Sequence, residues 1–388
     1  MFKKCIRFYA AINQIPIERQ FYRVINRIQL LLYGLFPSFF YKNIYKKSQK
    51  IQMAMGGFIE SDLLQESIRG YYSEASYFFV EEEGGCISLD ILGVRKTFHA
   101  KDISHVDFSE GNNQLRRMSL GYCGFLHDVV NYSKVNAVSN MNHIIDSYSA
   151  KKTWHKKGVF KSYWHPYCVS HRIINYVSLL KYEEDAGLKI DVRLLIDEIL
   201  FSLVFVEKNI EKELHYNHYS KNLIAIYVAK SVLGIDICQS FKNELKYSIS
   251  HQVNADGMQA ELSPMYNLLF LNDLKILCSI KGCDESLNRF FLETYDRIEV
   301  VAKLFFYNKN NLSVIGDSWV GEAARNFSVL NGNVTSILRD SGYLIHHSEK
   351  ISFIFDFGKA GARSNPGHSH SDFLHTELYV NNNPVFVD

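Results

Sequence analysis

The spacing of apolar residues changes once along this chain of 388 residues, near residue 335. Before that point, the segment 192–210 places apolar residues three and four apart with charges between them, which is typical of an amphipathic helix. The segments 222–233, 266–280 and 287–306 follow the same pattern. Serial helices of this length, joined by short loops, predict a helical bundle or toroid.

Beyond residue 335 the apolar residues alternate instead. The segments 336–347, 350–357 and 376–387 are short and rich in β-branched and aromatic residues, which predicts strands. The sequence NNN at 381–383 predicts a hairpin turn. The segment 85–98 is also strand-like and predicts a small insertion or edge in the helical part.

We therefore predict an α+β protein in three parts. These are a basic N-terminal segment at 1–55, a helical domain at 56–334 and the start of an antiparallel β domain at 335–388. The last predicted strand reaches residue 387, so we expect a sheet that is incomplete at the C-terminus and has an open apolar edge.

The charge of the chain is concentrated at its start. The total is +2, but residues 1–50 hold ten Lys or Arg and one Glu, a charge of +9 that leaves −7 for the remainder. The nearly uncharged run 28–40 is shorter than the roughly 20 apolar residues of a spanning helix. We favour a basic helix packed on the first domain, and keep as the alternative a helix of residues 1–50 lying on anionic lipid.

Two classes of segment are not found in this basic region. The small-residue cleavage site of a signal peptide is missing. No motif of a nucleic-acid-binding protein accompanies the basic residues, so we predict no nucleic-acid partner.

The first candidate site follows the sequence WHPY at 164–167. Arg172 and Asn175 are three residues apart, share a helix face and could hold an acidic ligand. A buried Arg172 that caps neighbouring helices is equally compatible with the sequence. The second candidate is the pair Asn217 and His218 with the nearby Asn222, because amide and imidazole groups can donate to a carboxylate.

The third candidate is DGMQAELSPMY at 256–266. Asp256 and Gly257 indicate a turn, and Ser263 with Pro264 indicates the start of a helix. Tyr266 then lies in the first turn, where the positive end of the helix dipole favours a phenolate. A tyrosine with a structural role is the alternative.

The fourth candidate is GHSHSD at 367–372 with Asp388. In an extended segment His368 and His370 point to the same side. A His and an Asp from adjacent strands are ordinary zinc ligands, although a closed zinc site needs four and the sequence offers two. A His-rich surface loop is the alternative.

Taken together and in this order, the motifs resemble the heparinase II/III-like family of polysaccharide lyases. The matching stretches are WHPYCVSHRIINY, NHYSKN, DGMQAELSPMY, GDS at 316–318, RDSGY at 339–343, and GHSHSD followed by PVFVD, with a looser match at 115–130. The resemblance covers about residues 85–388. It implies an incomplete α/α toroid followed by an antiparallel β-sandwich, here apparently cut short, and β-elimination on a uronate-containing polysaccharide.

The resemblance also implies roles for particular residues. Asn217 and His218 would bind the uronate carboxylate. Tyr266 would protonate the leaving glycosidic oxygen and could also act as the base, and His368 would be the base or its partner. His370 and Asp388 would hold a structural zinc ion, with a third ligand beyond residue 388.

Three further residues are expected to contact the acidic polysaccharide, and they are Arg172, Glu261 and Arg325. Family resemblance favours a periplasmic or cell-envelope location. The lack of a clear signal peptide leaves a cytoplasmic or membrane-peripheral location open. The sequence gives no indication of the oligomeric state.

Two other functions are kept beside the lyase. One is a non-catalytic protein that binds an acidic glycan during surface-polysaccharide assembly. The other is a glycoside hydrolase on a similar toroid, which needs two carboxylates roughly 5–10 Å apart. Asp256 and Glu261 are the only nearby pair, and Asp256 is expected to be used in a turn.

Overall fold

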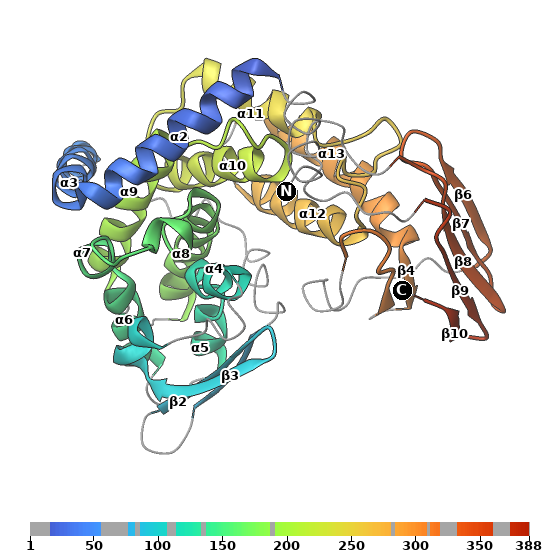
Figure 1. The fold of residues 1–388 in the computed structure, drawn as a ribbon, viewed down its shortest axis with the longest axis horizontal. Helices are drawn as coiled ribbons and strands as arrows, with labels where there is room; N and C mark the ends of the chain where they lie inside the picture. Colours follow the sequence, from blue (N-terminus) through green and yellow to red (C-terminus); the bar gives the residue numbers. More distant parts are fainter. Residues whose placement is uncertain are drawn as a thin grey trace, which may run out of the picture.

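The computed structural model describes ten segments of the chain. They are residues 16–55, 77–81, 86–106, 114–132, 137–186, 191–280, 284–308, 311–318, 332–359 and 373–387. Within them, a curved array of helices is followed by a β-sheet at one end of the molecule (Figure 1). This arrangement confirms the predicted order of a helical toroid and then an antiparallel β domain.

The described helices are α2 (Ile17–Leu35), α3 (Pro37–Ala54), α4 (Gln114–Tyr122), α5 (Leu126–Tyr132), α6 (Ala137–Tyr148), α7 (Ala150–Thr153), α8 (Pro166–Ala186), α9 (Val192–Lys208), α10 (Tyr216–Val232), α11 (Gln239–Ser250), α12 (Pro264–Ser279) and α13 (Glu285–Leu304). Short 3₁₀ turns lie at Ala100–His105 and Val159–Lys161. None of the helices in the described segments has both the length and the apolar character that crossing a bilayer requires.

Helix starts follow local sequence signals. The Asp191 side chain accepts from the Leu194 N–H at 3.0 Å and begins α9, and Asp284 accepts from Leu287 N–H at the start of α13. A carboxylate at this position satisfies backbone donors that have no partner in the first turn. The helices predicted near 192–210, 266–280 and 287–306 are confirmed as α9, α12 and α13.

The N-terminal helices pack on the toroid through a cluster of aromatic rings. Tyr33 of α2 is 1% exposed, and its ring lies 5.6 Å from that of Trp154 and 6.0 Å from that of Phe205. The Trp154 indole N–H donates to the carbonyl of Pro37 at 2.9 Å. The favoured interpretation of a basic helix packed on the first domain is therefore confirmed for residues 17–54.

The C-terminal sheet is a five-stranded antiparallel meander in the order β10-β9-β8-β7-β6. Its strands are β6 (Val334–Leu338), β7 (Tyr343–His347), β8 (Ile351–Asp356), β9 (Thr376–Val380) and β10 (Asn383–Phe386). Asn381 and Asn382 have φ values of 50° and 62° and form the turn between β9 and β10, as the NNN sequence predicts. The edge strand β10 is exposed, with Phe386 62% exposed.

Two smaller sheets belong to the helical part. One contains β1 (Tyr77–Glu81), β2 (Cys86–Ile91) and β3 (Val94–His99), which confirms the strand-like segment predicted at 85–98. The other pairs β4 (Phe306–Asn308) with β5 (Asn311–Leu312) and was not predicted from the sequence.

The large sheet is joined to the toroid by buried polar contacts. Both oxygens of the Asp256 carboxylate accept from Ser341, one from its N–H and the other from its hydroxyl, each at 2.8 Å. The Tyr343 hydroxyl donates to the carbonyl of Leu262 at 2.6 Å. Gly342 between them has a φ of 82°, and a Cβ there would lie 2.0 Å from the Cα of Gly358, so the turn requires glycine.

Candidate active site

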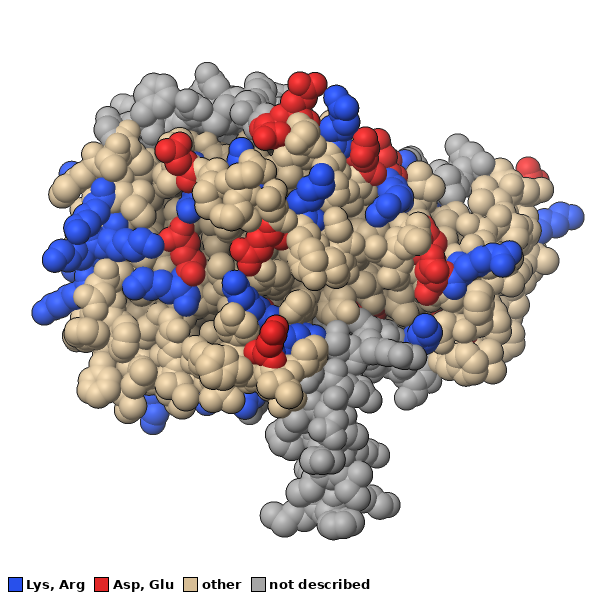
Figure 2. All heavy atoms as spheres, turned by 90° about the horizontal axis from the view of Figure 1, so that it is seen from above, with Lys and Arg blue, Asp and Glu red and all other residues tan. Residues whose placement is uncertain are grey.

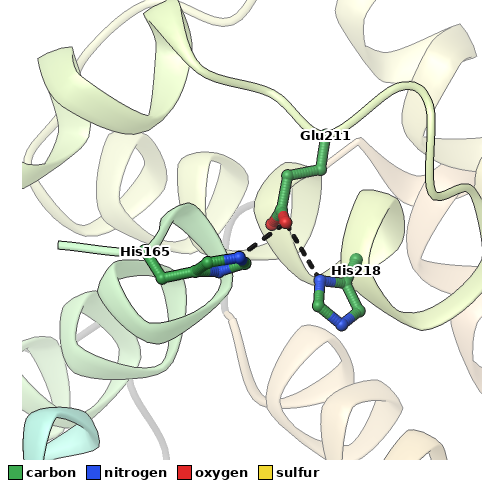
Figure 3. A group of neighbouring side chains, drawn as sticks. All are labelled: His165, Glu211 and His218. Atoms are coloured by element: carbon green, nitrogen blue, oxygen red, sulfur yellow. Dashed lines mark hydrogen bonds and ion pairs between the residues drawn. The ribbon is translucent and has the colours of Figure 1, made fainter. Parts of the chain in front are cut away.

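The centre of the candidate site is a buried carboxylate between two histidines (Figure 3). Glu211 is 3% exposed, and its Oε1 lies 3.0 Å from His218 Nδ1 and 3.7 Å from His165 Nδ1. The Asn222 amide donates to the other oxygen of Glu211 at 3.2 Å. An ionised carboxylate can only accept, so His218 must carry its proton on Nδ1 and leaves Nε2 for a ligand.

The pKa values of this group favour an anionic Glu211. Burial raises the pKa of Glu211, but the neighbouring His218 and His165 and the hydrogen bonds from His218 and Asn222 outweigh it, and the pKa lies below its ordinary value. Burial lowers the pKa of His165, which favours its neutral form. The group therefore combines an anionic carboxylate with two imidazoles.

The backbone is strained directly before Asn217 and His218. His215 and Tyr216, directly before Asn217, have φ values of 49° and 46°. Bulky residues in this region cost roughly 1–3 kcal/mol each, and such strain gathers at functional sites. The chain then enters α10, with Asn217 and His218 in its first turn. The Oδ1 atom of Asn217 is buried and has no hydrogen-bond partner among the residues that the structure describes.

Aromatic rings fix the imidazole planes around this turn. Tyr167 stacks on His218 with ring centroids 4.2 Å apart, and its edge contacts His171 at 4.7 Å. His171 in turn stacks on Tyr122 at 4.3 Å. Burial lowers the pKa of His171 well below its ordinary value, and Lys221 and His218 lower it further, so His171 is neutral.

Tyr266 lies in the first turn of the neighbouring helix α12. The helix begins at Ser263, whose side chain accepts from the Tyr266 N–H at 3.3 Å. The Ser263 hydroxyl also bonds to the Ser318 hydroxyl at 2.8 Å and donates to the carbonyl of Asp317 at 2.9 Å. The GDS sequence at 316–318 therefore fixes the N-terminal end of α12. Tyr266, in the first turn of that helix, is half-buried.

The helices that carry these residues are linked by a buried ion pair. Lys221 of α10 pairs with Asp273 of α12, and the two side chains are 4% and 6% exposed. At about 1.5 Å rise per residue, His218 is about 5 Å along α10 from Lys221, and Tyr266 is about 10 Å along α12 from Asp273. The ion pair therefore links the two helices, and His218 and Tyr266 both lie on the N-terminal side of it.

The three residues of Figure 3 could also hold a metal ion. The ligand atoms of His165, Glu211 and His218 lie within 4.8 Å of one another. Imidazole nitrogens and a carboxylate oxygen suit zinc. However, the 3.0 Å distance between Glu211 and His218 is that of a direct hydrogen bond. These two side chains therefore satisfy each other without a metal ion.

The prediction that Arg172 binds substrate is corrected. Arg172 is 1% exposed and donates to the carbonyls of Gly121 and Tyr163 at 3.3 and 3.0 Å. Its guanidinium also lies 3.9 Å from the centroid of the Tyr163 ring. The side chain ties neighbouring helices together, which is the structural alternative that the sequence left open.

The substrate contact predicted for Glu261 stays a prediction. Glu261 is 3% exposed, as buried as Glu211, and its backbone N–H donates to the Gln259 side chain at 2.7 Å. The remaining predicted residues, Arg325, His368, His370 and Asp388, lie outside the described residues. The zinc site and the role of His368 therefore stay predictions.

Two arginine side chains of α2 lie near Glu211 and His165. A pocket of about 200 Å³ lies beside His165 and Glu211, and Arg23 and Arg27 of α2 line it. These arginines could not be predicted from the sequence, because they lie more than 180 residues before Glu211 and outside the motifs. Glu211 was not predicted either, since it has no motif around it and precedes His218 by seven residues.

Comparison with known proteins supports the resemblance in two ways. Residues 335–388 match a family model described as heparinase II/III-like, C-terminal. The fold is similar to a crystal structure of heparinase III, with a TM-score of 0.52 and 15% identity, over 72% of this chain and 50% of that chain. The chain thus spans about half the length of the heparinase III that it matches.

A second similar structure is that of the heparan sulfate lyase HepC from Pedobacter heparinus. It has a TM-score of 0.46 and 14% identity, and the match covers 92% of this chain and 61% of that chain. No curated protein sequence matches this chain. The resemblance to the heparinase II/III-like family therefore stands on the C-terminal segment by sequence and on the toroid and sheet by fold.

Proposed function

We propose that this protein is a polysaccharide lyase that cleaves a uronate-containing polysaccharide by β-elimination. The observation that carries the proposal is the pair of helix starts described above. The first turn of α10 presents Asn217 and a His218 backed by Glu211, and the first turn of the adjacent α12 presents Tyr266. The fold of heparinase III and the matching C-terminal segment support the same reaction.

In this reaction a proton is removed from the carbon next to the uronate carboxylate. The ionised carboxylate makes that proton very weakly acidic, so its negative charge must be compensated. The Asn217 amide and His218 would donate to the carboxylate and stabilise the enolate-like transition state. The anionic Glu211 keeps the His218 ring oriented.

Tyr266 would complete the elimination. The C–H bond next to the carboxylate breaks, a carbon–carbon double bond forms, and the bond to the glycosidic oxygen breaks. If His368 is the base, it takes the carbon-bound proton and Tyr266 donates its own hydroxyl proton to the leaving oxygen. If the Tyr266 phenolate is the base, it takes the carbon-bound proton and then passes that proton to the leaving oxygen. The product is a chain with an unsaturated uronate at its new non-reducing end.

A hydrolase is less consistent with the structure. Both oxygens of Asp256 accept hydrogen bonds from Ser341, and Glu261 is buried. One member of the carboxylate pair that the sequence offered for hydrolysis, Asp256, is therefore used in the fold.

The proposal is tested by incubating the purified chain with sulfated and unsulfated uronate polysaccharides and recording the ultraviolet absorbance of the unsaturated product. We expect growth of that absorbance on at least one polymer and a loss of roughly 10²–10⁴-fold in Tyr266→Phe. Tyr247→Phe is the matched control, because Tyr247 is 55% exposed on α11. Binding of a polymer without cleavage, unchanged in Tyr266→Phe, would instead support a glycan-binding protein.

A further inference from the structure

One face of α2 is apolar and exposed. Six side chains at alternating spacings of four and three residues form an outer stripe, and each is more than half exposed: Ile17 83%, Phe21 63%, Val24 56%, Ile28 51%, Leu31 65% and Leu35 70%. This spacing places them on one side of a helix about 28 Å long. Contiguous apolar surface of this kind on a protein marks an interaction site.

The opposite face of α2 meets the toroid through polar side chains as well as through the buried Tyr33 ring. The Arg19 guanidinium donates to the carbonyl of Glu213 at 2.9 and 3.0 Å, and the Asn26 amide donates to the Glu213 carboxylate at 2.6 Å. The Gln29 amide donates to the carbonyl of Lys208 at 3.1 Å. A surface helix usually turns its apolar side to the core, whereas these contacts hold the outer stripe of α2 towards the outside.

The next helix, α3, adds a basic face. Phe39, Lys42, Lys46, Lys50 and Met53 follow one another at helical spacing, and all are exposed, with Phe39 at 61% and Met53 at 79%. Seen from above, Lys and Arg side chains crowd the edge of the molecule on which α3 lies (Figure 2). We call Lys42, Lys46 and Lys50 the lysine row.

We propose that α2 and α3 bind the surface of a membrane rich in anionic lipid, with the outer stripe at the level of the headgroups. Apolar and aromatic side chains beside a row of lysines are typical of helices that lie in such an interface. A second copy of the chain fits less well. Residues 16–55 contain seven Lys or Arg and only one acid, Glu18, so two copies would bring like charges together.

The inference does not depend on the catalytic assignment, and the full chain tests it. Vesicles of phosphatidylcholine, with and without phosphatidylglycerol, are sedimented with the protein, and the partition coefficient is measured. We expect binding to the anionic vesicles, reduced at least about tenfold in Phe21→Ser/Leu31→Ser. Replacing the lysine row with glutamine should reduce binding by a similar factor and lower its salt dependence.

Leu292→Ser/Val300→Ser is the matched control. These two side chains of α13 are 44% and 60% exposed and lie outside the outer stripe, so binding should not change. A second measurement covers the case in which the stripe variant folds poorly: a tryptophan at Leu31 should be quenched by brominated lipid, and a tryptophan at Val300 should not.

Three results would overturn the inference. One is equal binding of the wild type and the stripe variant, and another is a Leu31→Trp chain that brominated lipid does not quench. The third is a concentration-dependent dimer in light scattering that Phe21→Ser/Leu31→Ser abolishes, with no vesicle binding by the wild type. That result would assign the stripe to a second copy.

Discussion

At the scale of single residues, the central feature is the contact between Glu211 and His218. The carboxylate lies 3.0 Å from Nδ1 and leaves the other nitrogen of the ring for a ligand. Tyr167 stacks on the same ring and limits its rotation. A histidine held in this way can donate to an acidic group only in its protonated form, so the proposed role of His218 depends on Glu211.

Glu211→Gln tests that dependence. The amide still accepts from His218 but removes the negative charge that faces the imidazole. We expect catalytic efficiency to fall roughly 10–100-fold. Glu213→Gln is the control, since that carboxylate accepts from Asn26 and not from an imidazole. An unchanged catalytic efficiency in Glu211→Gln would remove Glu211 from the mechanism.

The buried side chain of Glu198 should make the stability of the folded state depend on pH. Burial raises the pKa of Glu198 from its ordinary value of 4.5 to about 8. The folded state therefore holds a proton that the unfolded state releases, and stability should fall as the pH rises from about 4.5 to about 8. Glu198→Gln keeps an acceptor for the Ala150 N–H and should stabilise the protein at pH 7 by on the order of 2 kcal/mol.

Glu207→Gln should have the opposite effect in the same thermal unfolding series. Lys230 and Lys47 outweigh burial and lower the pKa of Glu207, so its contribution is present above the ordinary carboxyl pKa and is lost as the pH falls. The variant should be less stable near neutrality and unchanged in acid.

A loss of stability at pH 7 in Glu198→Gln would contradict the first of these two predictions, because it would mean that Glu198 is ionised in the folded state.

At the scale of elements, the ion pair between α10 and α12 holds the two helix starts of the site. Lys221 and Asp273 are both almost fully buried, so removing one partner leaves a buried charge alone. Asp273→Asn should cost roughly 3–5 kcal/mol in urea unfolding, whereas the apolar double variant Lys221→Met/Asp273→Leu should cost much less. Equal losses in the single and double variants would contradict this account.

The same helices show what the sequence could and could not predict. Helical spacing predicted α9 and α13, because exposed charges mark one side of each helix. It also predicted α12, although Asp273 of that helix is buried. The start of α10 was set at 222 although the helix begins at Tyr216. Residues 219–229 are buried throughout, so no polar side marks the helix, and its first turn is polar.

Site residues divide in the same way. Tyr266 could be predicted because Ser263 and Pro264 mark the helix start locally. Glu211, Arg23 and Arg27 could not, because only the packing of α2 on the loop before α10 brings them together. Arg172 was misassigned because a guanidinium that binds backbone carbonyls cannot be told from one that binds a ligand by spacing alone.

At the scale of the whole molecule, the sheet and the toroid meet at the loop that leads to Tyr266. Asp256 accepts from Ser341, and Tyr343 donates to Leu262, so the loop between them is held from the β side. The sheet therefore supports the position of the loop that leads to Tyr266.

Asp256→Ala should loosen this junction. Two buried donors of Ser341 lose their acceptor, which costs roughly 2–3 kcal/mol, and the position of Tyr266 relaxes. We expect the turnover number to fall at least about tenfold with a smaller change in the Michaelis constant. Asp296→Ala, at an exposed position of α13, is the control for both measurements. Full activity together with lost stability would separate the junction from catalysis.

A crystal structure of Tyr266→Phe with a bound uronate-containing oligosaccharide would test the central claim most directly. The account predicts a uronate carboxylate roughly 3 Å from the Asn217 amide and from His218 Nε2, with the next glycosidic oxygen facing the ring at position 266. An oligosaccharide whose carboxylates contact neither Asn217 nor His218, or whose linkages lie away from α12, would contradict it.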